Sequence, residues 1–257
     1  MELVEYYTQN QIGYITLNRP AQQNALNPGL LQQLQAAFTQ AEADAACKVI
    51  VLKAKGEVFC VGADLNNAQT ADVNAITPAN SNVSQLPALL QQIYTLKKVV
   101  IAQVQGPAIS DGCGLAAVCD LAFAVPAATF GFTEVKTGLI PAIISVFLVR
   151  KIGAGKTKRL LLSGDLISAD EAQTLGLINF VVPTEDLEKT VAAFADKISR
   201  EIATELMATT KEIINDVQTM TLAEGLAYAA EKNTFARITP ASQRDMAAFL
   251  EKKKIYW

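Results

Sequence analysis

Residues 99–141, VVIAQVQGPAISDGCGLAAVCDLAFAVPAATFGFTEVKTGLIP, form the stretch of sequence that decides the fold. An apolar segment leads through a turn into a run of small residues, and a Phe-Gly-Phe-Thr sequence then precedes the carboxylate of Glu134. Only four charged side chains occur in the whole stretch. Burial in such apolar surroundings can tune a carboxylate for proton transfer near neutral pH. We therefore expect the chemistry of the protein to lie in this stretch.

The order of the predicted elements indicates an α/β fold. Within the stretch, an apolar strand at 99–105 is followed by a small-residue helix at about 112–119 and a second strand at 121–125. The upstream sequence predicts a hairpin of strands at 3–7 and 12–17, followed by a helix that begins at Pro28 and is capped by Asn27. A strand at 48–54 and a further helix at 83–96 are predicted next. Alternating strands and helices are typical of α/β layering with right-handed crossovers.

The last third of the chain is predicted to be mostly helical from about Gly153, apart from a short strand at 178–182. Helix starts are indicated by capping-box spacing at Ser168 with Glu171 and at Thr221 with Glu224, and by Thr239 followed by Pro240. Residues 59–82 are expected to form a long loop, of the kind that often covers a site. We expect a core at 1–198 and a helical C-terminal region at 199–257.

Composition narrows the function classes. The chain has 257 residues, 51% of them hydrophobic, and a formal net charge of −3, so it has no general basic field and nucleic acid is not an expected partner. MELVEYYTQ lacks the basic and apolar parts of a signal peptide, and no apolar run is long enough to span a membrane. A cytoplasmic location is therefore expected. The four cysteines have no CxxC spacing and are predicted to be buried free thiols, at Cys47, Cys60, Cys113 and Cys119.

The chain contains no histidine. This excludes Ser-His-Asp and Cys-His nucleophilic systems, HExxH zinc sites and most transition-metal sites, so no metal is expected. Acid–base work must fall to carboxylates, lysine, tyrosine or bound water.

Two nucleotide-binding patterns are incomplete. GAGKTK at 153–158 ends like a phosphate-binding loop, but the full pattern needs glycine where the chain has Arg150, and FLVRK before it is typical of a helix rather than a strand. A GxGxxA pattern begins at Gly112, but several residues separate it from the preceding strand, unlike a dinucleotide-binding turn. These glycines instead suit close approach of a ligand to a helix N-terminus.

Five segments, in order, resemble the crotonase or enoyl-CoA hydratase/isomerase superfamily. They are ITLNRPAQQNALN at 15–27, FCVGADL at 59–65, GPAISDGCGLAAVCDLAFA at 106–124, FGFTEVKTGLIPA at 130–142 and GDLISADEAQTLGLINFVVP at 164–183. The resemblance implies a spiral of ββα turns with a helical C-terminal region. It also implies an acyl-CoA substrate, no cofactor apart from the coenzyme A of that substrate, and a homotrimer or a hexamer built as a dimer of trimers.

The resemblance further implies an oxyanion hole, in which two backbone N–H groups hold the thioester oxygen and stabilise an enolate. Matched residue by residue, the donors are those of Ala63 and Asp111. Each such donor can contribute about 3 to 4 kcal/mol. Glu134 matches the general acid/base of the family. The second glutamate of many hydratases would fall on Gly114, where this chain has no carboxylate.

Asp111 stands where the family usually has glycine. One interpretation is an N-cap, for which aspartate is well suited. The other is a substitute for the carboxylate missing at Gly114. We favour the cap, because a negative charge beside an oxyanion hole raises the cost of the enolate unless the side chain turns away or is protonated.

Several further residues match substrate-binding positions of the family. The resemblance implies that the thioester is contacted by the segment at 59–65 and by the start of the small-residue helix. It also implies that the nucleotide is approached by the adenine-pocket loop at Ala25 and Leu26. The C-terminal helix AAFLEKKKIYW at 247–257 matches a helix that approaches the nucleotide, often from a neighbouring subunit. Together these assignments cover Ala25, Leu26, Ala63, Asp64, Leu65, Gly112, Phe249 and Lys252.

The resemblance leaves three functions open. FGFTEVKTGLIPAIISVFLVRKIG at 130–153 is similar to a subgroup of enoyl-CoA hydratases that includes bacterial methylglutaconyl-CoA hydratases, so hydration of a 2-enoyl-CoA is our first expectation. A single carboxylate also suffices for isomerisation of a 3-enoyl-CoA. The departures at Asp111 and Gly114 leave a non-catalytic acyl-CoA-binding protein as the third alternative. RNA binding, known for some relatives, is disfavoured by the acidic charge balance.

Overall fold

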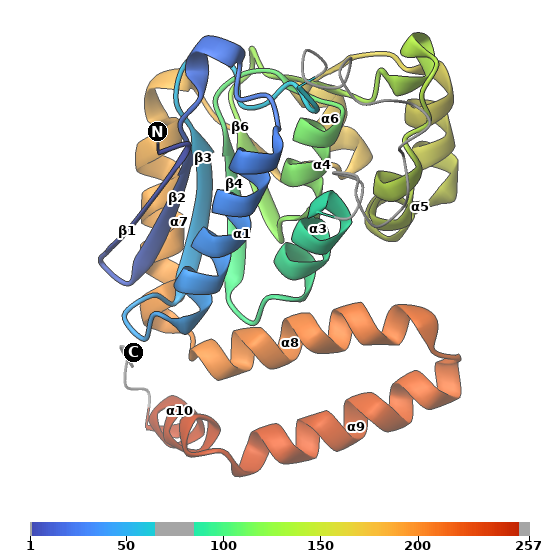
Figure 1. Ribbon diagram of the computed structural model, residues 1–257. Coiled ribbons are helices and arrows are strands. Elements are labelled where there is room, and N and C mark those ends of the chain that lie inside the picture. The colour runs from blue at the N-terminus through green and yellow to red at the C-terminus, as the bar shows by residue number, and fades with distance from the viewer. Residues whose placement is uncertain (1, 65–84, 252–257) are drawn as a thin grey trace.

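The computed structural model describes residues 2–64 and 85–251, and within these ranges the chain folds around two β-sheets (Figure 1). The larger sheet has the strand order β1-β2-β3-β4-β6-β9, and the smaller has the order β5-β7-β8. The β1–β2 and β7–β8 pairs are antiparallel, and the other neighbours are parallel. The strands are β1 Val4–Gln9, β2 Ile12–Leu17, β3 Val49–Ala54, β4 Val99–Val104, β5 Ala108–Ile109, β6 Leu121–Ala124, β7 Thr129–Gly131, β8 Ile167–Ser168 and β9 Phe180–Val181.

Helices cover both faces of the larger sheet, which confirms the α/β class. In Figure 1, α1 and α3 lie in front of the sheet and α7 lies behind it. No described helix combines the length and apolar character needed to cross a membrane. The α-helices are α1 Pro28–Ala43, α3 Gln85–Thr95, α4 Asp111–Val118, α5 Ala142–Ser163, α6 Ala169–Leu175, α7 Leu187–Glu201, α8 Thr204–Asp216, α9 Leu222–Ile238 and α10 Pro240–Leu250; the 3-10 helices are η1 Pro20–Gln22, η4 Glu134–Thr137, η5 Thr184–Asp186 and η6 Val217–Thr219.

The predicted N-terminal elements are confirmed, with local chemistry that explains them. Asn10 and Gln11 form the two-residue loop of the β1–β2 hairpin with φ of 52° and 65°, as a type I′ turn requires. The Asn27 side chain accepts a hydrogen bond from the Leu30 N–H at 2.8 Å, and Pro28 is the first residue of α1. Of the predicted 59–82 loop, residues 65–82 lie outside the described residues.

One prediction for the C-terminal half needs correction, and one small sheet was not foreseen. Helix begins at Ala142, before Gly153, and Gly153 interrupts α5 with φ 78° and ψ 161°. The helix start predicted at Ser168 is confirmed, because its side chain caps α6 by accepting from the Glu171 N–H, while the Glu171 carboxylate pairs with Arg159. The small sheet was not predicted, because strands of two or three residues leave no readable alternation.

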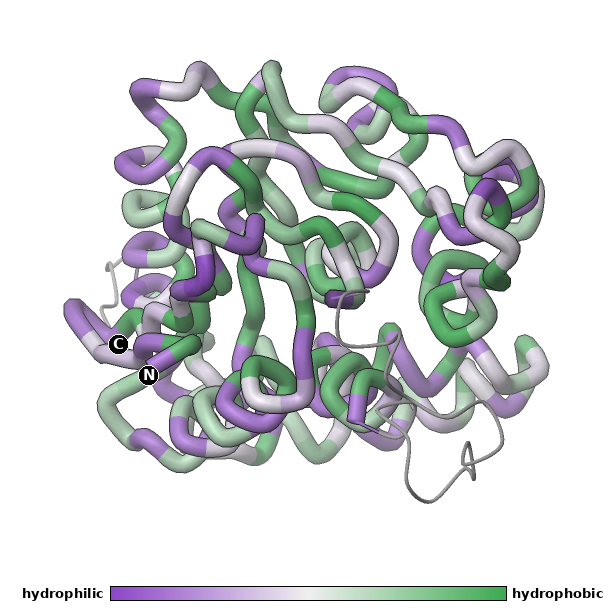
Figure 2. The backbone as a smooth tube through the Cα atoms, turned by 45° about the horizontal axis from the view of Figure 1, so that its top comes forward, coloured by the Kyte–Doolittle hydropathy of each residue, from purple (hydrophilic) through white to green (hydrophobic). Residues whose placement is uncertain are grey.

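The core lies between the larger sheet and its covering helices. Figure 2 shows hydrophobic residues concentrated in the central strands, whereas the outer helices mix hydrophobic and hydrophilic positions. The four cysteines are buried free thiols, as predicted. The largest fully buried side chains are Phe38, Phe59, Phe130, Phe132, Ile15, Leu17, Leu30, Leu34, Ile50, Leu52, Leu89 and Leu90.

The C-terminal helices extend away from the core. In Figure 1, α8 runs along one end of the core and α9 lies beyond it, with α10 turning back at the end of the chain. Thr221 and Glu224 form a complete capping box at the start of α9. None of the residues of α9 is buried, although the helix carries several large apolar side chains. The predicted division at 198/199 stays a prediction; α7, which packs on the sheet, ends close to it at Glu201.

The turn after β4 tests how closely this core is packed. A Cβ atom at Gly106 would lie 1.8 Å from the Glu57 carbonyl oxygen, so the backbone would have to move. We expect Gly106→Ala to lower the free energy of unfolding by about 3 kcal/mol. Gly155→Ala is the matched control, because Gly155 is helical with open space around it and alanine should stabilise by up to about 1 kcal/mol. Urea denaturation followed by circular dichroism measures both; equal midpoints would contradict the packing described.

Candidate active site

The candidate site is built where two backbone segments pair, the turn after β3 and the segment that leads into α4. Cys60 and Ala108 form a parallel bridge. The Ile109 N–H donates to the Cys60 carbonyl at 2.9 Å, and the Cys60 N–H donates to the Pro107 carbonyl at 3.2 Å. These bonds join the sequence-predicted FCVGADL turn to the N-terminal end of α4.

Two glycines allow the segments to come still closer. Gly62 has φ +87°, and a Cβ atom there would lie 2.9 Å from the Ser110 Cβ and 3.1 Å from the Asp111 nitrogen. A Cβ atom at Gly112 would lie 2.2 Å from the Cys60 carbonyl oxygen. Glycine is therefore required at both positions for steric reasons. The close approach places Ala63, the next residue after Gly62, beside the start of α4.

The backbone N–H groups of Ala63 and Asp111 are both available for a ligand. Asp111 is the first residue of α4, where an N–H has no partner inside the helix. Within the described part of the chain, neither N–H donates a hydrogen bond. Ser110, just before the helix, has φ 52° and ψ −126°, a backbone conformation that favours glycine. Strained backbone that aims a free N–H is typical of functional sites.

Glu134 reaches the same place from the smaller sheet. The Ser110 N–H donates to the Gly131 carbonyl at 2.8 Å, which ties the start of α4 to the end of β7. Glu134 is the first residue of η4, and the nearby Ser110 hydroxyl lowers the pKa of its carboxyl group. The Ser110 Oγ lies 3.2 Å from the Thr133 Oγ1. The Glu134 carboxylate oxygen Oε2 is buried and has no hydrogen-bond partner among the described residues.

Burial raises the pKa values of both carboxyl groups in the site. The pKa of Glu134 is raised above its ordinary value by burial, an effect partly offset by the Ser110 hydroxyl. Burial and the nearby charge of Glu134 raise the pKa of Asp111 to about 6. Both groups can therefore exchange protons closer to neutral pH than ordinary carboxyl groups do.

The prediction that Asp111 is an N-cap is wrong. Ser110 holds the N-cap position, and Asp111 lies one residue later, inside the helix. No side chain makes a capping hydrogen bond to this helix end. The Asp111 carboxylate instead lies close enough to Glu134 for their charges to interact.

Gly114 lies under an apolar side chain rather than in open space. A Cβ atom there would lie 3.1 Å from the Ile144 Cδ1, and Ile144 of α5 is only 2% exposed. The position that matches the second glutamate of many hydratases is thus covered by a buried isoleucine.

A third segment joins the FCVGADL turn from the other side. The Leu26 N–H donates to the Gly62 carbonyl at 2.7 Å, and the Asp64 N–H donates to the Leu26 carbonyl at 2.9 Å. Ala25 and Leu26 are both buried. The structure therefore brings the predicted residues Ala25, Leu26, Ala63, Asp64, Asp111 and Gly112 together.

Arg19 and Asn24 hold this third segment in place, and sequence reasoning assigned them no role. Arg19 Nη1 donates to the Asp64 carboxylate and to the Ala25 carbonyl at 2.7 and 2.9 Å. The Asn24 amide is fully buried and donates to the carbonyls of Lys55 and Val58. Both residues lie in the ITLNRPAQQNALN segment, but their partners are distant in sequence, so the pattern alone does not reveal the contacts.

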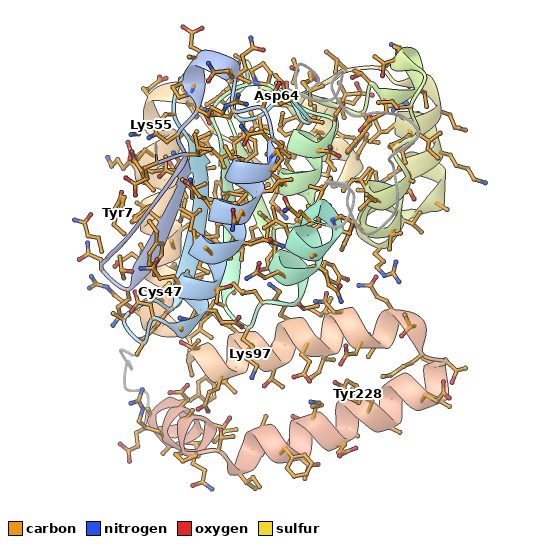
Figure 3. All side chains as sticks on the ribbon, viewed as in Figure 1. Tyr7, Cys47, Lys55, Asp64, Lys97 and Tyr228 are labelled. Atoms are coloured by element: carbon orange, nitrogen blue, oxygen red, sulfur yellow. The ribbon has the colours of Figure 1, made fainter. Side chains whose placement is uncertain are left out.

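The remaining predicted site residues are not brought to this place within one chain. Phe249 is 77% exposed on α10. In Figures 1 and 3, α10 lies at the end of the molecule opposite Asp64. Leu65 and Lys252 lie outside the described residues.

The other end of α4 adjoins a cavity of about 520 Å3 that does not include the candidate site. Lys151 of α5 lines it and donates to the carbonyls of Ala117 and Cys119, which fixes the C-terminal end of α4. Lys156 and Lys158 of the GAGKTK segment are exposed on α5, whereas Thr157 between them is buried, and Lys156 donates to the Leu175 carbonyl. Within the described ranges, no cluster of three or more acidic or cysteine residues is arranged to hold a metal ion.

The ion pair between Arg19 and Asp64 provides a test of how the site is held. Their side chains are only 15% and 7% exposed, so removing one partner leaves the other charge buried without it. We expect Arg19→Gln to lower the free energy of unfolding by about 3 kcal/mol. Arg200→Gln, which breaks an exposed pair with Asp196, should cost less than about 0.5 kcal/mol. Urea titrations compare the two; similar losses would show that burial of the first pair is unimportant.

The chain resembles known proteins over almost its whole length. The family model described as enoyl-CoA hydratase/isomerase matches residues 7–257. The chain is 34% identical to 2,3-dehydroadipyl-CoA hydratase of Escherichia coli over 246 residues, covering 95% of this chain and 94% of the relative. It is 35% identical to mitochondrial enoyl-CoA hydratase of Pongo abelii, covering 95% of this chain and 83% of the relative. The crystal structure of an enoyl-CoA hydratase from Mycobacterium smegmatis superposes with a TM-score of 0.93 at 29% identity, over 100% of this chain and 99% of that chain.

Proposed function

The chain belongs to the enoyl-CoA hydratase/isomerase family, and we propose that this enzyme adds water to the double bond of a 2-enoyl-CoA thioester. One observation carries the proposal: a carboxylate with a buried, unpartnered oxygen lies beside two free backbone N–H groups. Relatives named as hydratases support hydration over other reactions of the family.

The N–H groups of Ala63 and Asp111 serve as the oxyanion hole. The thioester oxygen accepts both hydrogen bonds, and these strengthen as negative charge develops on the oxygen during enolate formation. Donors held rigidly in a water-excluding site can each lower the barrier by about 3 kcal/mol. The bonds to Cys60 and Leu26 supply this rigidity, because they fix the backbone on both sides of the hole.

Glu134 is the acid–base group. Its raised pKa brings proton transfer closer to neutral pH, and its unpartnered Oε2 is available to a water or to a substrate proton. A group in this position can take a proton from the water that attacks C3. Isomerisation of a 3-enoyl-CoA is the second candidate, favoured by the absence of a carboxylate at Gly114, since one carboxylate suffices to move a proton between C2 and C4.

We further propose 3-methylglutaconyl-CoA as a candidate substrate. The support is the similarity of residues 130–153 to methylglutaconyl-CoA hydratases. The Escherichia coli relative is named for an acyl thioester that also bears a second carboxyl group. Beyond the coenzyme A of the substrate, the proposed reaction uses no cofactor.

Substitution of Glu134 tests the proposed reaction. We expect Glu134→Gln to lower kcat by about 1000-fold, because glutamine cannot transfer the proton, while binding of a saturated acyl-CoA remains. Crotonyl-CoA, 3-methylglutaconyl-CoA and a 3-enoyl-CoA are assayed in parallel, with calorimetry of butyryl-CoA binding. Turnover of the 3-enoyl thioester alone would replace hydration with isomerisation. Unchanged kcat in the variant would remove Glu134 from the mechanism.

The C-terminal helices support assembly into a homotrimer or a hexamer, with α10 covering the site of a neighbouring subunit. Phe249 would then approach the coenzyme A of that neighbour. The support is the exposure of large apolar side chains on α8, α9 and α10, which a stable protein usually covers, namely Ile214, Leu222, Leu226, Phe235, Ile238, Met246, Phe249 and Leu250.

Light scattering after gel filtration tests the assembly. We expect the wild type to have three or six times the mass of one chain. Leu222 and Leu226 are 81% and 63% exposed on one face of α9. Replacing both with serine should lower the mass, because the apolar contact is lost. Asn233→Ser, an exposed polar change in the same helix, should leave the mass unchanged. A wild type with the mass of one chain would overturn the assembly.

A further inference from the structure

We propose that Asp111 is a second acid–base residue of this site, and that its carboxyl does the work of the one missing at Gly114. The inference rests on the proposed hydration. Three structural observations support it: the helix face on which the residue lies, the side chain that covers Gly114, and the absence of a cation beside the two carboxyl groups.

Asp111 and Gly114 lie on one face of α4. They are three residues apart in the helix, and residues at that spacing are neighbours on its surface. A carboxyl at 111 therefore lies one turn earlier on the face from which a carboxyl at 114 would project. The side chain remains within electrostatic reach of Glu134, whose charge acts on it.

Ile144 closes the alternative position. Its Cδ1 lies 3.1 Å from where a Cβ of residue 114 would be, so a side chain at 114 would require Ile144 to shift. The chain thus combines an apolar filler over 114 with a new carboxyl at 111. If Asp111 served only to start the helix, nothing would connect these two departures.

The lysines and arginines of the surrounding segments are engaged elsewhere. Lys136 of η4 pairs with Asp165 at 2.7 Å, and Arg19 pairs with Asp64 at 2.7 Å. Lys151 of α5 donates to carbonyls at the far end of α4.

Arg150 of α5, the other helix packed on α4, donates to the Val146 carbonyl of its own helix. Helix α3, which packs on α4, contains no charged residue. The nearby thiols of Cys60 and Cys113 remain neutral, because burial raises the pKa of each to about 12. Among the described residues, no lysine or arginine forms an ion pair with Asp111 or Glu134.

Two uncompensated carboxyl groups hold one proton between them more easily than they bear two charges. This removes the objection that a charge at Asp111 would oppose the enolate. When its carboxyl is protonated, the side chain beside the oxyanion hole is neutral. With a pKa of about 6 in the free protein, the Asp111 carboxyl is protonated below that pH, and exclusion of water by a substrate would raise the pKa further.

The resulting reaction balances in protons. Glu134 accepts a proton from the water whose oxygen forms a bond to C3, and the C2–C3 π electrons move toward the thioester to give the enolate. The Asp111 carboxyl, next to the N–H that holds the thioester oxygen, gives its proton to C2 as the enolate collapses. The proton on Glu134 then passes to Asp111, which restores the starting state.

The sign of the effect of Asp111→Asn distinguishes this role from an inert one. An inert ionised carboxylate beside the oxyanion hole repels the enolate, so its removal should increase the rate. If Asp111 instead supplies the C2 proton, the Asp111→Asn variant has lost that acid and the rate should fall. Asp111→Gly tests the same difference with the residue that the family usually has. Both variants keep the backbone N–H.

We expect each variant to lower kcat/KM for crotonyl-CoA or 3-methylglutaconyl-CoA, whichever the wild type hydrates faster, by about 100-fold. The kcat/KM of the wild type should fall as pH rises above about 6, because Asp111 acts in its protonated form. The Asp111→Asn variant should lack this decline. Asp170→Asn, which removes an exposed acidic residue from the first turn of α6, should keep the wild-type rate and pH profile.

Circular dichroism and calorimetry with butyryl-CoA accompany the kinetics. A variant that is folded, binds butyryl-CoA as the wild type does and is slowed supports the proposal. A rate equal to or above that of the wild type, an unchanged pH profile, or a slowed variant that has lost folding or binding overturns it. Failure of the wild type to hydrate either thioester would instead overturn the proposed function, so the two failures can be told apart.

Discussion

The site depends on one steric constraint, the contact between the backbone of the FCVGADL turn and the backbone at the start of α4. A side chain at either Gly62 or Gly112 would force the facing segment of the chain to move. This contact places two N–H groups together without using a side chain for the purpose. The chemistry therefore depends on the shape of the main chain, and side chains such as Arg19 and Asn24 matter because they hold that shape from outside.

The same contact determines the electrostatics. The first turn of a helix favours negative charge, which suits an enolate oxygen and also suits a carboxylate. Here both would compete for one helix end, because Asp111 supplies the N–H and the carboxyl. Glu134 adds a further negative charge, and the pKa of Asp111 is raised in response. A proton must therefore be present in the site for the enolate to be stabilised well, which couples the oxyanion hole to the protonation of its own residue.

Much of the fold was readable from sequence, and the reasons are local. The β1–β2 hairpin, the cap at Asn27 and the strand, helix and strand of residues 99–125 follow from periodicity and from turn residues. The family resemblance, now confirmed, added the order of the ββα turns. The small sheet and the break at Gly153 could not be read, because they depend on contacts between distant segments.

The candidate site was predictable to a different extent for backbone and for side chains. The glycines at 112 and 114 indicated close approach to a helix N-terminus, and the family resemblance indicated the two donor positions, but the pairing of the two backbone segments became visible only in the structure. The role of the Asp111 side chain left no signal in the sequence, because an aspartate at this position is compatible both with a helix cap and with a partner of Glu134. Only the backbone angles of Ser110 and the cover of Ile144 over Gly114 separate the two. A substituted catalytic position is thus best judged together with the space left at the original one. Here Ile144 would have to shift before a side chain could occupy position 114, whereas the carboxyl proposed to replace it lies one turn earlier on the same helix face.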